Sequence, residues 1–285
     1  HAPYDWWWMD VIESHAAQLP AIDERWTGRV GDRDELIRGL LDGRIAGPSL
    51  SHPLDNVLRN IRLLCEGDPD KQFGLSGLPG AFSPSEVLGL VGRAAGFTPD
   101  PNATTGPVPV VPELVIDACD AVGYRLGEAC ARGERMILAT GHPVGLAHLY
   151  TGVGRQLAAR GVELLRPYEG VAWRDPDDRH GWQVRYLEGV ALLTDRASAR
   201  HTHRGDAMAR MLGEVRPDLV FADHGFAGAA IEAGVETLSI ADVNDPALLV
   251  ARAQGRTDTV VVMDDNVQPD AYWPCYQAIA AHLAD

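Results

Sequence analysis

Three short apolar runs in the last third of the chain, each followed by polar residues, constrain the fold more than any other feature. The runs cover residues 218–222, 237–241 and 259–263. Short apolar or β-branched runs bounded by turn-forming residues predict buried strands, and a helix-length segment separates the first two. This alternation predicts an α/β fold with a Rossmann-like, mostly parallel sheet that has helices on both faces.

The polar residues that follow these runs predict where the active site lies. In open parallel sheets, ligands bind beyond the carboxyl ends of the strands. Carboxylates follow all three runs, and an imidazole follows the first. These residues are Asp223 and His224 after the first run, Asp242 after the second, and Asp264 and Asp265 after the third.

The order of the remaining elements predicts two parts. A loop rich in Gly and Pro near residue 110 separates a helical portion, residues 1–110, from an α/β catalytic domain, residues 111–285. The helical portion is expected to close over the site and select the substrate, with Trp6 to Trp8 as a candidate aromatic surface. In the catalytic domain we expect a helix at 112–132, a strand at 135–139, a helix ending near residue 160 and a strand at 161–165. A hairpin or two successive short strands follow at 183–194, and the last helix lies at 271–283.

The composition excludes several classes of protein. A net charge of −15 argues against a nucleic-acid-binding surface, because phosphate backbones require clustered Lys and Arg. Lys71 is the only lysine, so arginine carries nearly all of the positive charge. The apolar runs are too short to span a membrane, and the four scattered cysteines indicate neither a disulfide scaffold nor a zinc ribbon. These features are typical of a cytoplasmic protein.

The turn TGHPVG at residues 140–145 follows a predicted strand and precedes a predicted helix. Gly141 and Gly145 would let backbone N–H groups approach an anion such as phosphate. His142, which precedes a proline, would project from the strand end. The turn is not a P-loop and lacks GxGxxG, so it gives only weak support to a dinucleotide-binding fold.

Two further groups of residues are candidates for catalysis. His201 and His203 lie on the same side of an extended segment, so they can share a metal or a phosphate, and Arg204 beside them can bind phosphate. Asp223 and His224 can act as a general acid/base pair or as metal ligands. Helix capping is the alternative role for Asp223 and for the Asp-Pro pair at 245–246.

The strand-end carboxylates also predict a metal site. Asp264 and Asp265 place two like charges side by side, which costs energy unless a cation or a proton is shared. Oxygen-rich sites suit Mg²⁺ or Mn²⁺ better than zinc. We therefore expect Mg²⁺ or Mn²⁺ as the cofactor, held by some of Asp223, Asp242, Asp264 and Asp265.

Several blocks of sequence keep their order and spacing over about 150 residues. The blocks are LATGHPVGLAHLY at 138–150, HTHRGDAM at 201–208, DLVFADHGFAGAA at 218–230, and SIADVNDPAL with VVMDDNVQP between 239 and 269. Together they resemble a bacterial family whose members are labelled phosphatases. The order of strands and helices is also similar to that of the DUF89 metal-dependent phosphatases, which place Asp and Asn ligands at strand ends. The resemblance implies an α/β phosphatase, and a weaker match at 51–67 implies a role for Asn56.

These features lead to one main prediction and two alternatives. We expect a phosphatase that hydrolyses a small phosphorylated metabolite, such as a sugar phosphate or a nucleoside monophosphate, with Asn56 and Arg59 contacting this substrate. Four histidines would bind the phosphate or transfer protons: His142, His201, His203 and His224. The alternatives are a hydrolase or lyase of a nucleoside or sugar, and a non-catalytic sugar-phosphate or nucleotide sensor. We expect no nucleic-acid or membrane partner, and a homodimer is left open.

Overall fold

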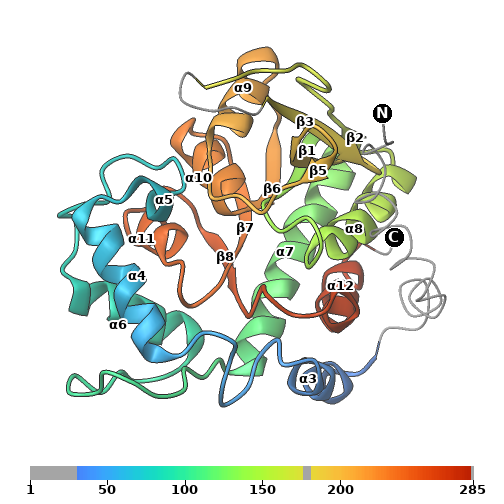
Figure 1. The fold of residues 1–285 in the computed structure, drawn as a ribbon. Helices are drawn as coiled ribbons and strands as arrows, with labels where there is room; N and C mark the ends of the chain where they lie inside the picture. Colours follow the sequence, from blue (N-terminus) through green and yellow to red (C-terminus); the bar gives the residue numbers. More distant parts are fainter. Residues whose placement is uncertain (1–30, 176–180, 284–285) are drawn as a thin grey trace.

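The computed structural model describes residues 31–175 and 181–283, which form an α/β structure (Figure 1). The described part contains ten α-helices and a mixed, mostly parallel sheet of eight strands. The α/β prediction with a mostly parallel sheet is thereby confirmed, and the Rossmann-like assignment stays a prediction. Trp6 to Trp8 lie outside the described residues.

Strand β1 (Arg135–Thr140) lies inside a sheet whose order is β3-β4-β1-β6-β7-β8. On one side, β1 pairs with β2 near its start and with β4 near its end. On its other side, β1 pairs with β6. All of these pairs are parallel, as are β6 with β7 and β7 with β8, whereas β3 and β5 run antiparallel to β4. The carboxyl ends of β1, β6, β7 and β8 therefore meet at one edge. The other strands are β2 (Glu163–Leu164), β3 (Trp182–Leu187), β4 (Val190–Asp195), β5 (Ser198–Ala199), β6 (Leu219–Asp223), β7 (Thr237–Ala241) and β8 (Thr259–Val262).

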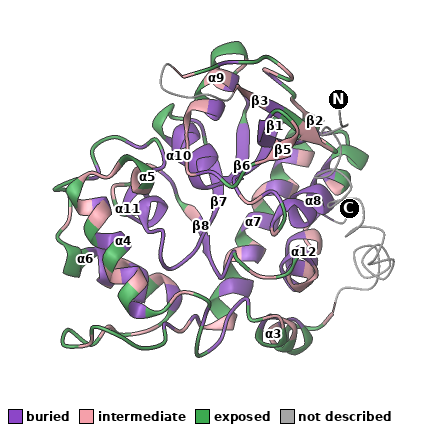
Figure 2. Cartoon of the chain, in the orientation of Figure 1, coloured by how far each residue is buried: buried purple, intermediate pink, exposed green. Residues whose placement is uncertain are grey.

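Helices cover both faces of this sheet (Figure 1). One layer contains α7 (Pro112–Arg132), α8 (Ala147–Ala159) and α12 (Trp273–Ala280), with α3 (Arg33–Asp42) packed against it. The other layer contains α9 (Asp206–Glu214), α10 (His224–Glu232) and α11 (Ala247–Ala253), with α4 (Leu54–Glu66), α5 (Pro69–Gln72) and α6 (Pro84–Ala95) beside it. Strands β1, β4, β6, β7 and β8 and the helix faces turned toward them are mostly buried, whereas β2, β3 and β5 are partly exposed (Figure 2).

Local sequence signals account for the boundaries of several helices. The helix predicted at 112–132 is α7 itself, with Pro112 in its first turn and Gly133 ending it at φ +62°. Helix α6 was not predicted separately, although its start carries a capping box between Ser83 and Glu86. The predicted last helix is divided into the 3₁₀-helix η1 (Pro269–Tyr272) and α12.

The helical portion that precedes residue 111 contacts the sheet close to the strand ends. The Asp264 N–H donates to the Ile45 carbonyl at 2.9 Å, and Gly47 forms an isolated bridge with Val110. The predicted domain boundary at residue 110 stays a prediction. Within the described residues, every helix is too short or too polar to cross a membrane.

Candidate active site

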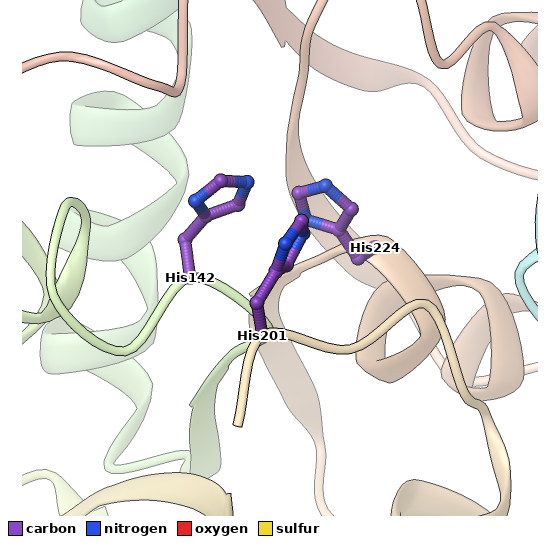
Figure 3. Close-up of side chains that lie close together, drawn as sticks. All are labelled: His142, His201 and His224. Atoms are coloured by element: carbon purple, nitrogen blue, oxygen red, sulfur yellow. The ribbon is translucent and has the colours of Figure 1, made fainter. Parts of the chain in front are cut away.

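Four imidazoles converge at the carboxyl edge of the sheet. His142 follows β1, His224 follows β6, and His201 and His203 lie in the segment before α9. The ring centroid of His142 lies 4.2 Å from that of His201 and 4.7 Å from that of His224. His203 stacks on His224 at 5.0 Å, with 10° between the ring planes. Figure 3 shows three of these rings facing one another from separate segments, so the structure brings the predicted histidines together.

Three of these histidines form a candidate metal centre, and Asp265 lies against two of them. Ligand nitrogens of His142, His201 and His224 all lie within 4.8 Å of one another. Asp265 Oδ1 is 3.4 Å from His142 Nε2, and Oδ2 is 3.5 Å from His224 Nε2. Two atoms bound at about 2.1 Å to one ion, at the tetrahedral angle, lie about 3.4 Å apart. Asp265 Oδ2 is buried and lacks a hydrogen-bond partner among the described residues, so a cation fits this position.

His224 is held in place by its backbone and by its neighbour Asp223. Its φ of +47° lies in the left-handed region, which costs a residue with a side chain about 1–2 kcal/mol. Its Nδ1 is 2.8 Å from Asp223 Oδ1, which also accepts a hydrogen bond from the Gly141 N–H at 2.7 Å. Asp223 makes no side-chain cap for α10. Its carboxylate therefore lies behind the ring and directs Nε2 toward Asp265.

Burial favours the neutral form of these imidazoles. Desolvation, followed by the nearby His224, lowers the pKa of His142 to about 2. Desolvation also lowers the pKa of His224 to about 3, and it lowers the pKa of His201, although His201 is the exposed one of the three. A neutral imidazole has the free nitrogen lone pair that metal binding requires.

The carboxylates predicted as metal ligands differ in how many hydrogen bonds their oxygens already accept. Asp264 accepts hydrogen bonds from the N–H and the hydroxyl of Ser51, at 2.7 and 2.9 Å. Asp242 accepts hydrogen bonds from two backbone N–H groups. Burial, followed by neighbouring carboxylates, raises the pKa of Asp242 and of Asp265 well above the usual range. Asp223 and Asp265 each keep a buried Oδ2 without a hydrogen-bond partner among the described residues. Asp223 uses its other oxygen to hold His224 and the Gly141 N–H, whereas Asp265 contacts both His142 and His224.

The predicted substrate-binding residues are placed unevenly. Asn56 accepts a hydrogen bond from Asn244 at 3.1 Å, in the segment that follows β7. Arg59 lies farther along α4 and is exposed. The charge of Arg204 is already paired, because its guanidinium lies over the Trp182 ring and contacts two carboxylates, those of Asp175 and Asp206.

The two glycines of the predicted anion-binding turn allow close packing. A side chain at Gly141 would place its Cβ 2.5 Å from the Thr202 carbonyl oxygen, and one at Gly145 would lie 3.3 Å from the Asp265 carbonyl oxygen. The Gly141 N–H is used by Asp223. The turn therefore brings the segment with His201 and the segment with Asp265 close to His142.

Sequence reasoning missed a group of residues that contact the far side of the cluster. Lys71 Nζ is 3.3 Å from Asp245 Oδ1, and Asp70 Oδ2 is 2.9 Å from His203 Nδ1. Asp245 does not cap α11, which begins at Ala247 after Pro246. One available signal was that the chain has a single lysine. The contacts themselves join segments that are far apart in the sequence, and periodicity does not report such pairs.

An α/β fold with imidazoles and carboxylates at the strand ends defines a candidate hydrolase site, and the comparisons give its family. The chain belongs to the phosphatase family, which it matches over residues 31–284. It is 34% identical over 257 residues to Phosphatase SCO2771 from Streptomyces coelicolor, an alignment that covers 88% of this chain and 94% of that protein. No solved structure matches the chain. The phosphatase family expected from the sequence blocks is thereby confirmed.

Proposed function

We propose that this protein is a metal-assisted phosphatase that hydrolyses the phosphomonoester of a small metabolite. The observation that carries the proposal is the cluster of His142, His201 and His224 against the unsatisfied carboxylate of Asp265. Neutral imidazoles around a buried acidic group are an arrangement that binds a divalent cation. Membership of the phosphatase family supports the reaction class.

The charge of the site supports the need for a cation. Five buried carboxylates surround or adjoin the imidazoles: Asp223, Asp242, Asp245, Asp264 and Asp265. A phosphomonoester dianion would be repelled by those that are ionised unless positive charge is supplied. Imidazole-rich donor sets favour transition metals over Mg²⁺. Of the two ions predicted from the sequence we therefore favour Mn²⁺, and we add Zn²⁺.

The residues of the chain would supply a rigid frame for this chemistry. When bound, the ion would polarise a phosphoryl oxygen and acidify a water molecule. Asp223 fixes the orientation of His224, and Asp265 spans His142 and His224, so these donors need little rearrangement to bind. His203 stacks on the other side of His224, where it can hold a proton for the leaving oxygen.

Metal binding and phosphate release test the proposal together. Thermal unfolding of EDTA-treated protein would be measured with added Mn²⁺, Zn²⁺ or Mg²⁺. Separate samples with the same ions would be assayed for phosphate release from sugar phosphates and nucleoside monophosphates. Saturating ion at about 100 times its Kd should stabilise the fold by about 2.7 kcal/mol. We expect His142→Ala and His224→Ala to lose both this shift and the release of phosphate.

His282→Ala is the matched control, because His282 pairs with Asp120 and lies outside the cluster. This variant should bind metal and release phosphate like the wild type. Wild-type protein that releases no phosphate with any ion would contradict the proposal. Release that persists in EDTA would remove its metal component.

A further inference from the structure

The only lysine of the chain lies beside the imidazole cluster on a short segment that is packed tightly in place. Phe73, which follows α5, is buried and has a φ of +54°. Its ring centroid lies 5.0 Å from that of His203 and 5.1 Å from that of His224. A Cβ at Gly228 of α10 would lie 2.0 Å from the Phe73 carbonyl oxygen, so this glycine permits the approach. The segment with Asp70 and Lys71 is therefore fixed to the imidazoles.

Lys71 is paired with two carboxylates but keeps hydrogen-bonding capacity at its ammonium group. Its side chain is 13% exposed, and Nζ lies 3.3 Å from one oxygen of Asp70 and 3.3 Å from one of Asp245. Strong charge-assisted hydrogen bonds are shorter, at about 2.7–2.9 Å. An ammonium group has three donors, so at least one remains for a ligand. Ligand atoms of His203, His224 and Asp245 also lie within 4.8 Å of one another, a spacing that could hold a second metal ion. Because Lys71 already supplies a cation to Asp245, we interpret this side of the cluster as an anion site instead.

Asp70 contacts both Lys71 and His203. Its Oδ2 is 2.9 Å from His203 Nδ1, so Nε2 is the ring nitrogen left to act in the site. His203 Nε2 lies 4.0 Å from Asp245 Oδ2, the carboxylate that also contacts Lys71. The lysine nitrogen and the free imidazole nitrogen therefore approach the same carboxylate.

We propose that Lys71 binds the phosphoryl oxygens of the substrate, and that Asp70 positions Lys71 for this contact and His203 for proton transfer to the leaving oxygen. This inference rests on the proposed phosphatase function. Water would bond to phosphorus as the ester P–O bond breaks. The proton on His203 Nε2 would pass to the leaving oxygen, the attacking water would lose one proton to solvent, and solvent would reprotonate His203. The products are an alcohol and inorganic phosphate.

Kinetics of variants at both positions test the assignment. Lys71→Met should lower kcat/KM by about 10- to 100-fold, as expected for loss of one hydrogen bond to a charged group. Most of this loss should appear in KM, and Lys71→Arg should recover most of it. Asp70→Asn should slow alkyl phosphates about tenfold more than p-nitrophenyl phosphate, whose leaving group needs little protonation. A merely structural effect of Asp70 would slow both substrates equally.

Chemical labelling gives a readout that does not depend on turnover. In the wild-type chain, Lys71 supplies the only side-chain amine, so reductive methylation followed by mass spectrometry reports on it directly. Inorganic phosphate should slow methylation of Lys71 but not of the N-terminal amine, whereas chloride at equal ionic strength should slow neither.

The outcomes separate this inference from the proposed function. Hydrolysis by the wild type with an unchanged KM in Lys71→Met would overturn the inference and leave the phosphatase intact. If the wild type hydrolyses nothing, protection of Lys71 by phosphate would still support an anion site, and its absence would reject one. If Lys71 resists the reagent in both samples, the kinetics of Lys71→Met decide.

Discussion

The carboxyl group of Asp265 lies in surroundings that oppose its ionised form in the absence of a cation. It is buried between His142 and His224, both of which burial keeps neutral, and it lies near Asp242. Its pKa is therefore raised well above 3.8 in the folded protein. The folded state binds this proton more tightly than the unfolded state, so metal-free stability falls as the pH rises above about 4 toward the folded pKa.

Asp265→Asn should therefore stabilise the metal-free protein while abolishing activity. The difference from wild type should be near zero at about pH 4 and should grow as the pH rises toward the folded-state pKa of Asp265. Denaturant unfolding in EDTA across this range measures it. Asp258→Asn, at an exposed position, is the control and should show no such trend. A constant difference across the range would contradict the assigned cause, and added Mn²⁺ should reverse the order of stability.

Helix α10 is placed by close contacts between backbones rather than by large side chains. A Cβ at Gly225 would lie 2.2 Å from the Arg204 carbonyl, and one at Gly228 would meet Phe73 at 2.0 Å. These contacts fix the segment with His203 on one side of the helix and the segment with Lys71 on another. The spacing of the imidazoles therefore depends on two glycines that make no chemical contribution of their own.

Gly228→Ala should destabilise the protein and lower its activity together. Overpacking of this kind costs about 1–3 kcal/mol, and displacement of Phe73 would move Lys71 away from Asp245. Gly213→Ala in α9 is the matched control, because a Cβ there meets nothing within 4 Å. That change should stabilise the protein by up to about 1 kcal/mol, as alanine favours helix over glycine. Thermal unfolding and phosphate release would check both, and equal behaviour of the two variants would contradict the packing argument.

The elements that sequence predicted well are those whose signals are local. Helix α7 has proline and glycine at its ends, and β6, β7 and β8 are apolar runs bounded by turn formers, so their positions follow from neighbouring residues. Strand β2 was predicted longer, at 161–165, but only two of its residues pair with β1. Strand pairing depends on the partner strand, which periodicity in one segment does not describe.

The sequence predicted the part of the site that follows from the ends of the strands. Strand ends in a parallel sheet meet, so the convergence of His142, His224 and Asp265 follows from topology. Topology does not predict which of the carboxylates are free to bind a ligand and which already accept hydrogen bonds. Asp264 is occupied because Ser51, from a distant loop, donates two hydrogen bonds to it. Such pairings exist only after the helical portion has packed on the sheet.

At the scale of the whole molecule, the net charge of −15 opposes the approach of an anionic substrate. Under the proposed function, a bound cation and Lys71 would act at short range inside the site, where screening by salt is weak. The exposed carboxylates act at longer range, and their repulsion is screened strongly. The two contributions therefore respond differently to ionic strength.

For a phosphomonoester dianion, KM should fall about two- to threefold as ionic strength rises from about 20 to about 200 mM, with kcat unchanged. Screening removes the long-range repulsion and leaves the short-range attraction of the site nearly intact. Sodium chloride and sodium acetate should act equally, which would separate screening from competition by a particular anion, and sucrose should have no effect. A KM that rises with salt would mean that the field at the site entrance is positive despite the net charge. If the field is positive, the KM of Lys71→Met should depend less on ionic strength than the KM of the wild type. If long-range repulsion dominates, as we expect, Lys71→Met should have a higher KM that falls with ionic strength as steeply as that of the wild type.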